Sequence, residues 1–257
     1  MHVKQLFNIS GKTAIVTGGG RGLGEQIATS LAEAGANVVV CSRKLEACEE
    51  VCHKLKDIGV DSLAFKCDVT NPDDINHVVR QTSGHFGKID ILFNNSGATW
   101  GTPAVDMPLD KWQKVMNVNA TGTFLMSQTV GKVMIEHGGG KIVNIASTAG
   151  LNGAMPESLD AIGYNTSKGA VVTFTKDLAA KWARYNINVN AIAPGFFPTK
   201  MTKGVLEKAG KDILKHVPLG RFGSDHDLKG AALFLASPAS DYVTGHILVV
   251  DGGGNAT

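Results

Sequence analysis

The chain has 257 residues, of which 43% are hydrophobic and 19% charged, and its formal net charge is +2. This composition is typical of one globular domain with a large apolar core, so we expect a single domain over residues 1–257. A nearly balanced charge without a long basic run gives no indication of a nucleic-acid surface, and no apolar stretch approaches the ~18 residues of a membrane span. The opening MHVKQLFNISGK has no signal-peptide core, so we expect a soluble cytoplasmic protein.

Short apolar runs rich in β-branched residues alternate with longer amphipathic segments along the whole chain. Alternation of this kind predicts an α/β fold, a doubly wound sheet of about seven parallel strands with helices on both faces. The first runs are almost continuously apolar, as in strands that are buried on both faces. The pattern predicts strands at 13–17, 37–41, 62–67, 89–94, 141–146, 187–193 and 246–250, and helices near 22–35, 44–58, 72–86, 109–136, 161–185 and 225–236.

Glycines gather directly after the first predicted strand, in TGGGRGLGEQIATSLAEAG. Gly18, Gly22 and Gly24 allow a tight turn and a close approach of the backbone to a diphosphate. The helix that starts near Arg21 presents free N–H groups and the positive end of its dipole. The spacing is G-x-x-x-G-x-G rather than G-x-G-x-x-G, but the turn lies between a strand and a helix, as nucleotide binding requires. We therefore predict a nucleotide site here.

The second predicted strand ends in Ser42 and Arg43, where an NAD-binding chain often has Asp or Glu. Such an acid accepts hydrogen bonds from the ribose hydroxyls of NAD and repels the 2′-phosphate of NADP. Here a hydroxyl and a guanidinium take its place, and a second guanidinium, Arg21, lies in the glycine turn. Two guanidiniums bind a phosphate through charge-assisted hydrogen bonds. The pattern favours NADP(H), with NAD(H) as the second choice; the alternative is that Arg43 only caps a strand on the surface and Arg21 points to solvent.

The four cysteines, Cys41, Cys48, Cys52 and Cys67, are expected to stay reduced in a cytoplasmic protein. Cys48 and Cys52 together with His53 could offer metal ligands, but no second ligand pair follows at zinc spacing. We predict buried or helix-face thiols and no metal site.

Tyr164 and Lys168 lie four residues apart on a predicted helix, so their side chains project from one face. Ser147 ends the fifth predicted strand, at the edge of the sheet where ligands bind in such folds. A phenol with a pKa near ~10 is a weak acid-base catalyst at neutral pH, and a neighbouring ammonium would lower that pKa. The three residues suggest an acid-base site; the alternative is a surface tyrosine beside a solvated lysine.

These motifs occur in the order and spacing of the short-chain dehydrogenase/reductase family. The resemblance covers essentially the whole chain and extends to CDVT at 67–70, NNSG at 94–97, VNATG around Asn119 and PGFFPT at 194–199. It implies a single-domain Rossmann-type fold and an oxidoreductase that interconverts a ketone and a secondary alcohol on an NAD(P) cofactor. The expected partner is a small-molecule carbonyl or alcohol, with no nucleic acid and no membrane.

The resemblance also implies a role for each matching residue. Tyr164 would pass a proton to or from the substrate oxygen, and Ser147 would position the carbonyl. Lys168 would lower the tyrosine pKa and hold the nicotinamide ribose, and Asn119 would help a water link this lysine to solvent. Cofactor contacts are implied for Gly18, Gly20, Arg21, Gly22, Leu23, Gly24, Ser42, Arg43, Asp68, Val69, Asn95, Ser96, Gly97, Pro194, Gly195, Phe197 and Thr199, and for Tyr164 and Lys168 themselves.

Three segments, at 98–101, 193–202 and 218–237, resemble two subgroups of the family. One comprises 3-oxoacyl reductases related to rhamnolipid synthesis, and the other comprises gluconate 5-dehydrogenase-like enzymes. An expected apolar pocket rim favours a 3-oxoacyl or similar apolar ketone. The alternatives are a gluconate 5-dehydrogenase-like polyol or sugar-acid dehydrogenase and a catalytically silent cofactor-binding regulator. The rim residues are Trp100, Met155, Phe196 and Phe197.

Two connections in the chain are unusually long. The interval from Ser147 to Tyr164 is several residues longer than is usual in the family, and 194–223 is too long for an ordinary connection. We expect the latter to form a lid that is ordered at least over a bound ligand. Relatives usually form tetramers through the two helices expected here at 109–136 and 161–185, together with the last strand and its neighbouring helix, so we predict a homotetramer. Small or apolar residues on these helices are Ala120, Gly122, Phe124, Ala170, Val171 and Phe174.

Overall fold

The computed structural model describes residues 2–256 and contains one sheet of seven parallel strands. The strands lie in the order β3-β2-β1-β4-β5-β6-β7, so the chain winds outward in both directions from the β1/β4 pair. The predicted doubly wound α/β class is confirmed. The strands are β1 (Thr13–Thr17), β2 (Asn37–Ser42), β3 (Ser62–Lys66), β4 (Ile91–Asn94), β5 (Gly140–Ile145), β6 (Ile187–Pro194) and β7 (Ile247–Val250).

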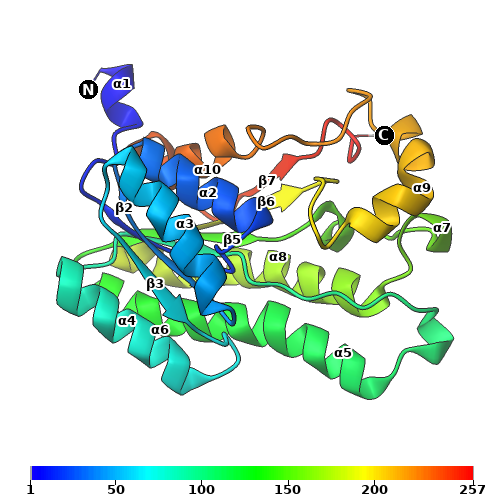
Figure 1. Ribbon diagram of the computed structural model, residues 1–257, viewed down its shortest axis with the longest axis horizontal. Coiled ribbons are helices and arrows are strands. Elements are labelled where there is room, and N and C mark those ends of the chain that lie inside the picture. Colours follow the sequence, from blue (N-terminus) through cyan, green and yellow to red (C-terminus); the bar gives the residue numbers. More distant parts are fainter. Residues whose placement is uncertain (1, 257) are drawn as a thin grey trace.

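Helices form one layer on each face of the sheet (Figure 1). Each layer packs on the apolar side chains of one face of the sheet. No helix of the described chain is long and apolar enough to cross a membrane. One layer contains α2 (Gly22–Glu33), α3 (Leu45–Ile58) and α10 (Lys229–Ala236), and the other contains α4 (Pro72–Phe86), α6 (Gly122–Glu136) and α8 (Ile162–Trp182).

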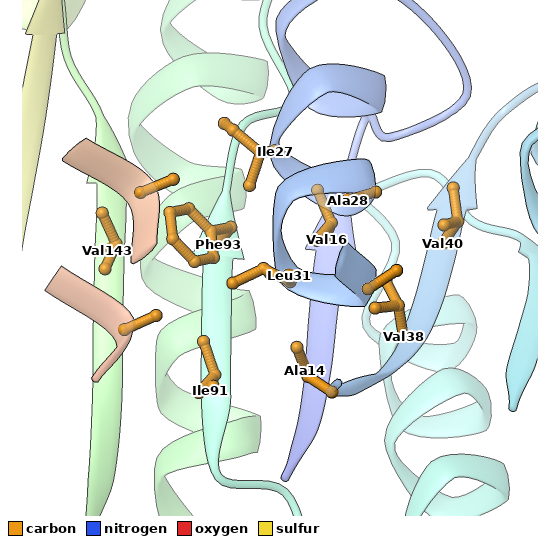
Figure 2. Close-up of a cluster of buried hydrophobic side chains, with 14 of the residues drawn as sticks. Ala14, Val16, Ile27, Ala28, Leu31, Val38, Val40, Ile91, Phe93 and Val143 are labelled. Atoms are coloured by element: carbon orange, nitrogen blue, oxygen red, sulfur yellow. The ribbon is translucent and has the colours of Figure 1, made fainter. Parts of the chain in front are cut away.

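Alternate residues of each strand face opposite layers, because successive side chains of a strand point to opposite sides. Ala14 and Val16 of β1 belong to the cluster that includes α2, whereas Ile15 belongs to the cluster that includes α6 and α8. Figure 2 shows the first cluster, in which Ile27 and Leu31 of α2 lie over the strand side chains. Burial on both faces accounts for the uninterrupted apolar runs in the sequence.

The expected continuous helix over 109–136 is wrong in its middle. The structure has α5 (Leu109–Met116), then a π-helical turn, η2 (Asn117–Thr121), and then α6. A π turn inserts one extra residue into the helix and thereby rotates the side chains that follow, and such turns are frequent at functional sites. Asn119, predicted to be functional, lies inside this turn and is buried.

The two long connections contain helices that the sequence analysis did not predict. The 194–223 segment carries α9 (Lys203–Lys215), and the interval after Ser147 carries η3 (Thr148–Gly150) and α7 (Pro156–Leu159). Helices α7 and α9 lie side by side at one end of the molecule (Figure 1). The remaining short helices are α1 (Val3–Leu6), η1 (Ala104–Asp106), η4 (Ala183–Tyr185) and η5 (Pro238–Ser240).

The last helix starts later than expected, at Lys229 rather than 225. The residues before it form a turn in which the N–H and O–H of Ser224 both donate to the Asp227 carboxylate at 2.7 Å. Side chains of this kind compete with the helical backbone for hydrogen bonds, which delays the start of the helix.

A buried polar network joins the centre of the sheet to α6 and α8. The Asn94 amide donates to Ser127 Oγ and to Asn144 Oδ1, both at 2.9 Å. The Asn144 amide in turn donates to Thr175 Oγ1 at 2.9 Å. All four side chains are buried, so their pairing fixes how these two helices lie against β4 and β5.

Candidate active site

A cavity of about 740 Å³ opens beyond the carboxyl ends of the strands. Residues that follow six strands, β1 to β6, line it, as expected at the crossover of a doubly wound sheet. Every residue predicted to contact the cofactor lines this cavity, and so do Ser147, Tyr164 and Lys168. Asn119 is the exception. The cavity also includes two cations that the sequence analysis missed, Lys44 and Lys200.

The glycine turn is held against the end of β4 by hydrogen bonds. Gly18 has a φ of +62°, and a Cβ on Gly24 would lie 2.4 Å from Asn95 Nδ2, so both positions require glycine. Asn95 Nδ2 donates to the carbonyls of Thr17 at 3.0 Å and Gly18 at 3.1 Å. The N–H groups of Asn95 and Ser96 donate to Thr17 Oγ1, each at 3.0 Å. The Asn95 side chain, expected beside the ribose, therefore braces the turn.

The start of α2 fits a diphosphate. Arg21 is the N-cap residue, and its side chain makes no capping hydrogen bond to the helix. The first N–H groups of α2 therefore have no side-chain acceptor from the N-cap and lie beside the cavity that Gly22, Leu23 and Gly24 line. Asp68 and Val69, also expected to contact the cofactor, line the same cavity beyond the end of β3.

The end of β2 offers one exposed guanidinium rather than a free hydroxyl. Arg43 is exposed and lines the cavity. Ser42, predicted to donate to a phosphate, instead donates to the carbonyl of Lys44 at 3.0 Å and accepts from Cys48 Sγ at 3.1 Å. Partial burial acts to raise the pKa of Asp68, but hydrogen bonds from Thr70 and the Arg43 cation lower it. Arg43 therefore acts on this subsite electrostatically.

Helix α8 carries the reacting groups next to the end of β5. Lys168 is only 4% exposed, and its Nζ donates to the carbonyl of Ile145 at 2.6 Å. The same nitrogen lies 5.7 Å from the centroid of the Tyr164 ring. Ser147 is the N-cap residue of η3, and its Oγ accepts the N–H of Ala149 at 3.2 Å.

The pKa values of Lys168 and Tyr164 differ from those expected. Burial lowers the pKa of Lys168 to about 8. Burial raises the pKa of Tyr164, and hydrogen bonding with Ser147 opposes that rise. The expected net lowering of the tyrosine pKa is not seen, because burial raises the pKa of Tyr164 more than the hydrogen bond with Ser147 lowers it. The hydrogen bond with Ser147 therefore favours the phenolate in the cofactor-free structure.

Asn119 does not reach the cavity. Its Oδ1 accepts the N–H of Ala98 at 2.7 Å, and its Nδ2 donates to the carbonyl of Ala98 at 2.9 Å and to Ser167 Oγ at 2.8 Å. Both amide protons are therefore used inside the protein. The side chain holds neighbouring segments together, and the water link expected of it would need another group.

The expected apolar rim is not formed. Phe197 lines the cavity but is only 3% exposed and packs closely on Gly223. Trp100 and Met155 are exposed and lie outside the lining, and the Lys111 amine sits 5.2 Å from the Trp100 ring. The sequence pattern could not separate a rim from an outer surface, because both expose large apolar side chains.

Comparison with known proteins gives consistent matches over the full chain. A family model described as enoyl-(acyl carrier protein) reductase matches residues 18–255. The chain is 41% identical over 254 residues to the 2-dehydro-3-deoxy-D-gluconate 5-dehydrogenase of Bacillus subtilis, with 98% of each chain covered. It is also 41% identical to an NAD-dependent glycerol dehydrogenase of Listeria innocua, covering 96% of this chain and 95% of that one. Identity to a 3-oxoacyl-[acyl-carrier-protein] reductase of Synechocystis is 36%, covering 95% and 97%.

Solved structures agree with these matches. A short-chain type dehydrogenase/reductase from Mycobacterium marinum superposes with a TM-score of 0.96 at 37% identity. A gluconate 5-dehydrogenase from Burkholderia cenocepacia, in complex with NADP and tartrate, superposes with a TM-score of 0.94 at 36% identity. Both alignments cover 100% of either chain.

Replacing Tyr164 by Phe removes the phenolic O–H and leaves the ring over the cavity. We expect the unfolding midpoint and the cofactor affinity to stay near those of the wild type. Turnover with any carbonyl that the wild type reduces should fall by roughly 10²–10⁴-fold, the usual worth of a positioned proton donor. Absorbance of the reduced nicotinamide measures this, with the exposed Tyr242→Phe as the matched control. Wild-type turnover in Tyr164→Phe would remove Tyr164 from the chemistry.

Proposed function

The chain belongs to the short-chain dehydrogenase/reductase family and is an oxidoreductase acting on CH–OH groups, and from this premise we propose that it interconverts a keto sugar acid and its secondary alcohol with NADP(H). The observation that carries the proposal is the full-length similarity to the Bacillus subtilis 2-dehydro-3-deoxy-D-gluconate 5-dehydrogenase. The 3-oxoacyl reductase favoured by the sequence has less support, since that relative is less similar and three of the four residues of the expected apolar rim lie outside the cavity lining.

The charge of the cavity supports an anionic substrate. Among the described residues that line it, five are cations and one, Asp68, is an acid. Arg21 lies at the glycine turn proposed for the diphosphate, Arg43 and Lys44 follow β2, and Lys168 donates to a backbone carbonyl. Lys200 is exposed and follows β6, so it is the lining cation available to a substrate carboxylate. Attraction of an anion into such a cleft raises its local concentration.

The proposed mechanism assigns the proton chemistry to three side chains. A bound nicotinamide cofactor supplies hydride transfer. Tyr164 donates its phenolic proton to the developing alkoxide during reduction and takes it back during oxidation. Ser147 hydrogen-bonds with the phenol and stabilises the phenolate that remains. Lys168 holds positive charge beside the same ring, which further favours the phenolate after proton transfer.

We also propose that NADP(H) is the preferred cofactor. Arg43 is exposed at the end of β2, where an acid would repel a 2′-phosphate, and Arg21 lines the same cavity. The Burkholderia cenocepacia relative was solved with NADP, which supports this choice. The NAD-dependent glycerol dehydrogenase relative supports the alternative, an uncharged polyol with NAD.

A homotetramer built on α6 and α8 is proposed as the assembly. Phe124 of α6 is 44% exposed and meets Phe174 of α8 edge-to-face, with ring centroids 6.3 Å apart. Gly122 and Val171, also expected at the interface, pack inside the subunit instead. A monomeric mass in light scattering at micromolar protein would overturn the proposal.

A carbonyl panel tests the proposed substrate class. Purified protein with NADPH is offered 5-keto-D-gluconate, an uncharged ketose of the same length and an acetoacetyl thioester. We expect kcat/KM for the keto sugar acid to exceed that for the ketose by about tenfold or more, because one charge-assisted hydrogen bond contributes ~1.5–3 kcal/mol. Faster reduction of the thioester would favour the 3-oxoacyl alternative. Tight cofactor binding without turnover of any carbonyl would favour the regulator.

Truncating Arg43 to Ala tests the cofactor preference. The Kd of NADPH should rise by roughly 10- to 100-fold, because charge-assisted hydrogen bonds to the 2′-phosphate are lost. The Kd of NADH should change less than about threefold. Fluorescence titration measures both, with Lys66→Ala as the control, since Lys66 is an exposed cation at the end of β3 outside the cavity lining. Equal loss of both cofactors, or a wild type that prefers NADH, contradicts the assignment.

A further inference from the structure

One buried hydroxyl of α8 lies between the two reacting side chains in the sequence and is absent from the proposed mechanism. Ser167 is 0% exposed and immediately precedes Lys168. Its Oγ donates a hydrogen bond to the carbonyl of Tyr164 at 2.7 Å and accepts one from Asn119 Nδ2 at 2.8 Å. The Ser167 hydroxyl therefore donates one hydrogen bond within α8 and accepts one from the π turn, which links the two elements.

Asn119 extends this link to the wall of the cavity. Its side chain pairs with both backbone groups of Ala98, the N–H at 2.7 Å and the carbonyl at 2.9 Å. Ala98 directly follows Gly97, which lines the cavity. A Cβ on Gly97 would lie 3.6 Å from Asn119 Oδ1 and 4.0 Å from Lys168 Nζ, so this stretch of wall passes beside the amine.

The backbone of Asn119 is held within the π turn. The turn departs from the regular helix between α5 and α6, and the Asn119 carbonyl already accepts the hydroxyl of Thr123 at 2.7 Å. Without the Ser167 hydroxyl, one buried amide proton of Asn119 loses its acceptor. A buried unpaired donor costs free energy, so the amide would shift to find another partner. Such a shift would move the Ala98 segment relative to α8.

We propose that Ser167 is a positioning residue for the reaction, which through Asn119 holds the cavity wall at Gly97 and Ala98 in register with Tyr164 and Lys168. The proposal rests on the proton chemistry assigned to Tyr164 and Lys168 in the proposed function. Ser167 touches no reacting atom, so its effect passes through the placement of other groups. Misplacement of a catalytic group by about 1 Å can cost ~10²-fold in rate.

The same helix contains a matched control. Thr175 is also 0% exposed, its Oγ1 donates to the carbonyl of Val171 at 2.7 Å, and it accepts from Asn144 Nδ2 at 2.9 Å. Each hydroxyl thus bonds one carbonyl of its own helix and one asparagine amide. Asn144 lies within β5 and outside the cavity lining. Removing either hydroxyl leaves the same kind of buried orphan, but Asn144 stays paired with Asn94 through its Oδ1, and only Asn119 pairs with the backbone of the cavity loop at Ala98.

The experiment compares Ser167→Ala with Thr175→Val in the full-length enzyme, using any carbonyl that the wild type reduces. Both variants should lose unfolding free energy to a similar extent in urea. Ser167→Ala should lower kcat by about 10- to 100-fold and move the pH profile of kcat/KM, whereas Thr175→Val should keep both. The double variant Asn119→Ala/Ser167→Ala should be no slower than Asn119→Ala alone, because the two residues act in series.

An exchange measurement keeps the test independent of turnover. The Ala98 amide donates to Asn119 Oδ1, so its hydrogen exchange should quicken by about tenfold or more in Ser167→Ala and stay unchanged in Thr175→Val. If the wild type reduces no carbonyl, the proposed function fails while exchange at Ala98 still decides whether the coupling exists. Equal activity, pH profile and exchange in the two variants would overturn the proposal. If Ser167→Ala does not fold, Ser167→Cys, which keeps the size but weakens the hydrogen bonds, is judged in the same way.

Discussion

The amine of Lys168, buried and held by the Ile145 carbonyl at the end of β5, is the constraint on which the candidate active site depends. Burial lowers its pKa from 10.5 to about 8, which corresponds to ~3 kcal/mol of lost stability while the amine is charged. Proteins keep such costly groups mainly where function needs them. Three groups surround the amine: the Ile145 carbonyl accepts its hydrogen bond, the Tyr164 ring lies beside it, and the wall at Gly97 passes close by.

The fold supplies this arrangement from the sheet outward. The amides of Asn94 and Asn144 fix α6 and α8 against β4 and β5, and the π turn then directs Asn119 toward the start of α8. On the other side, Asn95 ties the glycine turn of β1 to the end of β4. Residues 95–98 therefore form one loop that borders both the cofactor cavity and the reacting groups. The side chains of Asn95 and Asn119 hold this loop in place rather than bind a ligand.

Much of this was predictable, because it depends on local periodicity. Buried parallel strands show as apolar runs, and the four-residue spacing of Tyr164 and Lys168 places them on one helix face. What the sequence could not show depends on three-dimensional pairing. The π turn at Asn119 produces no periodic pattern in the sequence. The Ser42 hydroxyl donates to the carbonyl of Lys44, and the side chains of Trp100 and Met155 are exposed. Lys200 was missed because a lone cation in a connection has no distinguishing pattern.

The pH dependence of unfolding tests the buried-amine account most directly. The folded pKa of Lys168 lies below its unfolded value, so the unfolded chain binds more protons between about pH 8 and 10.5, and stability must rise with pH across that window. Urea unfolding of the cofactor-free wild type and of Lys168→Met is measured from about pH 7 to about pH 9.5. The wild type should gain about 2 kcal/mol relative to the variant over this range. A difference between the two proteins that stays constant with pH would contradict a buried, titrating amine at this position.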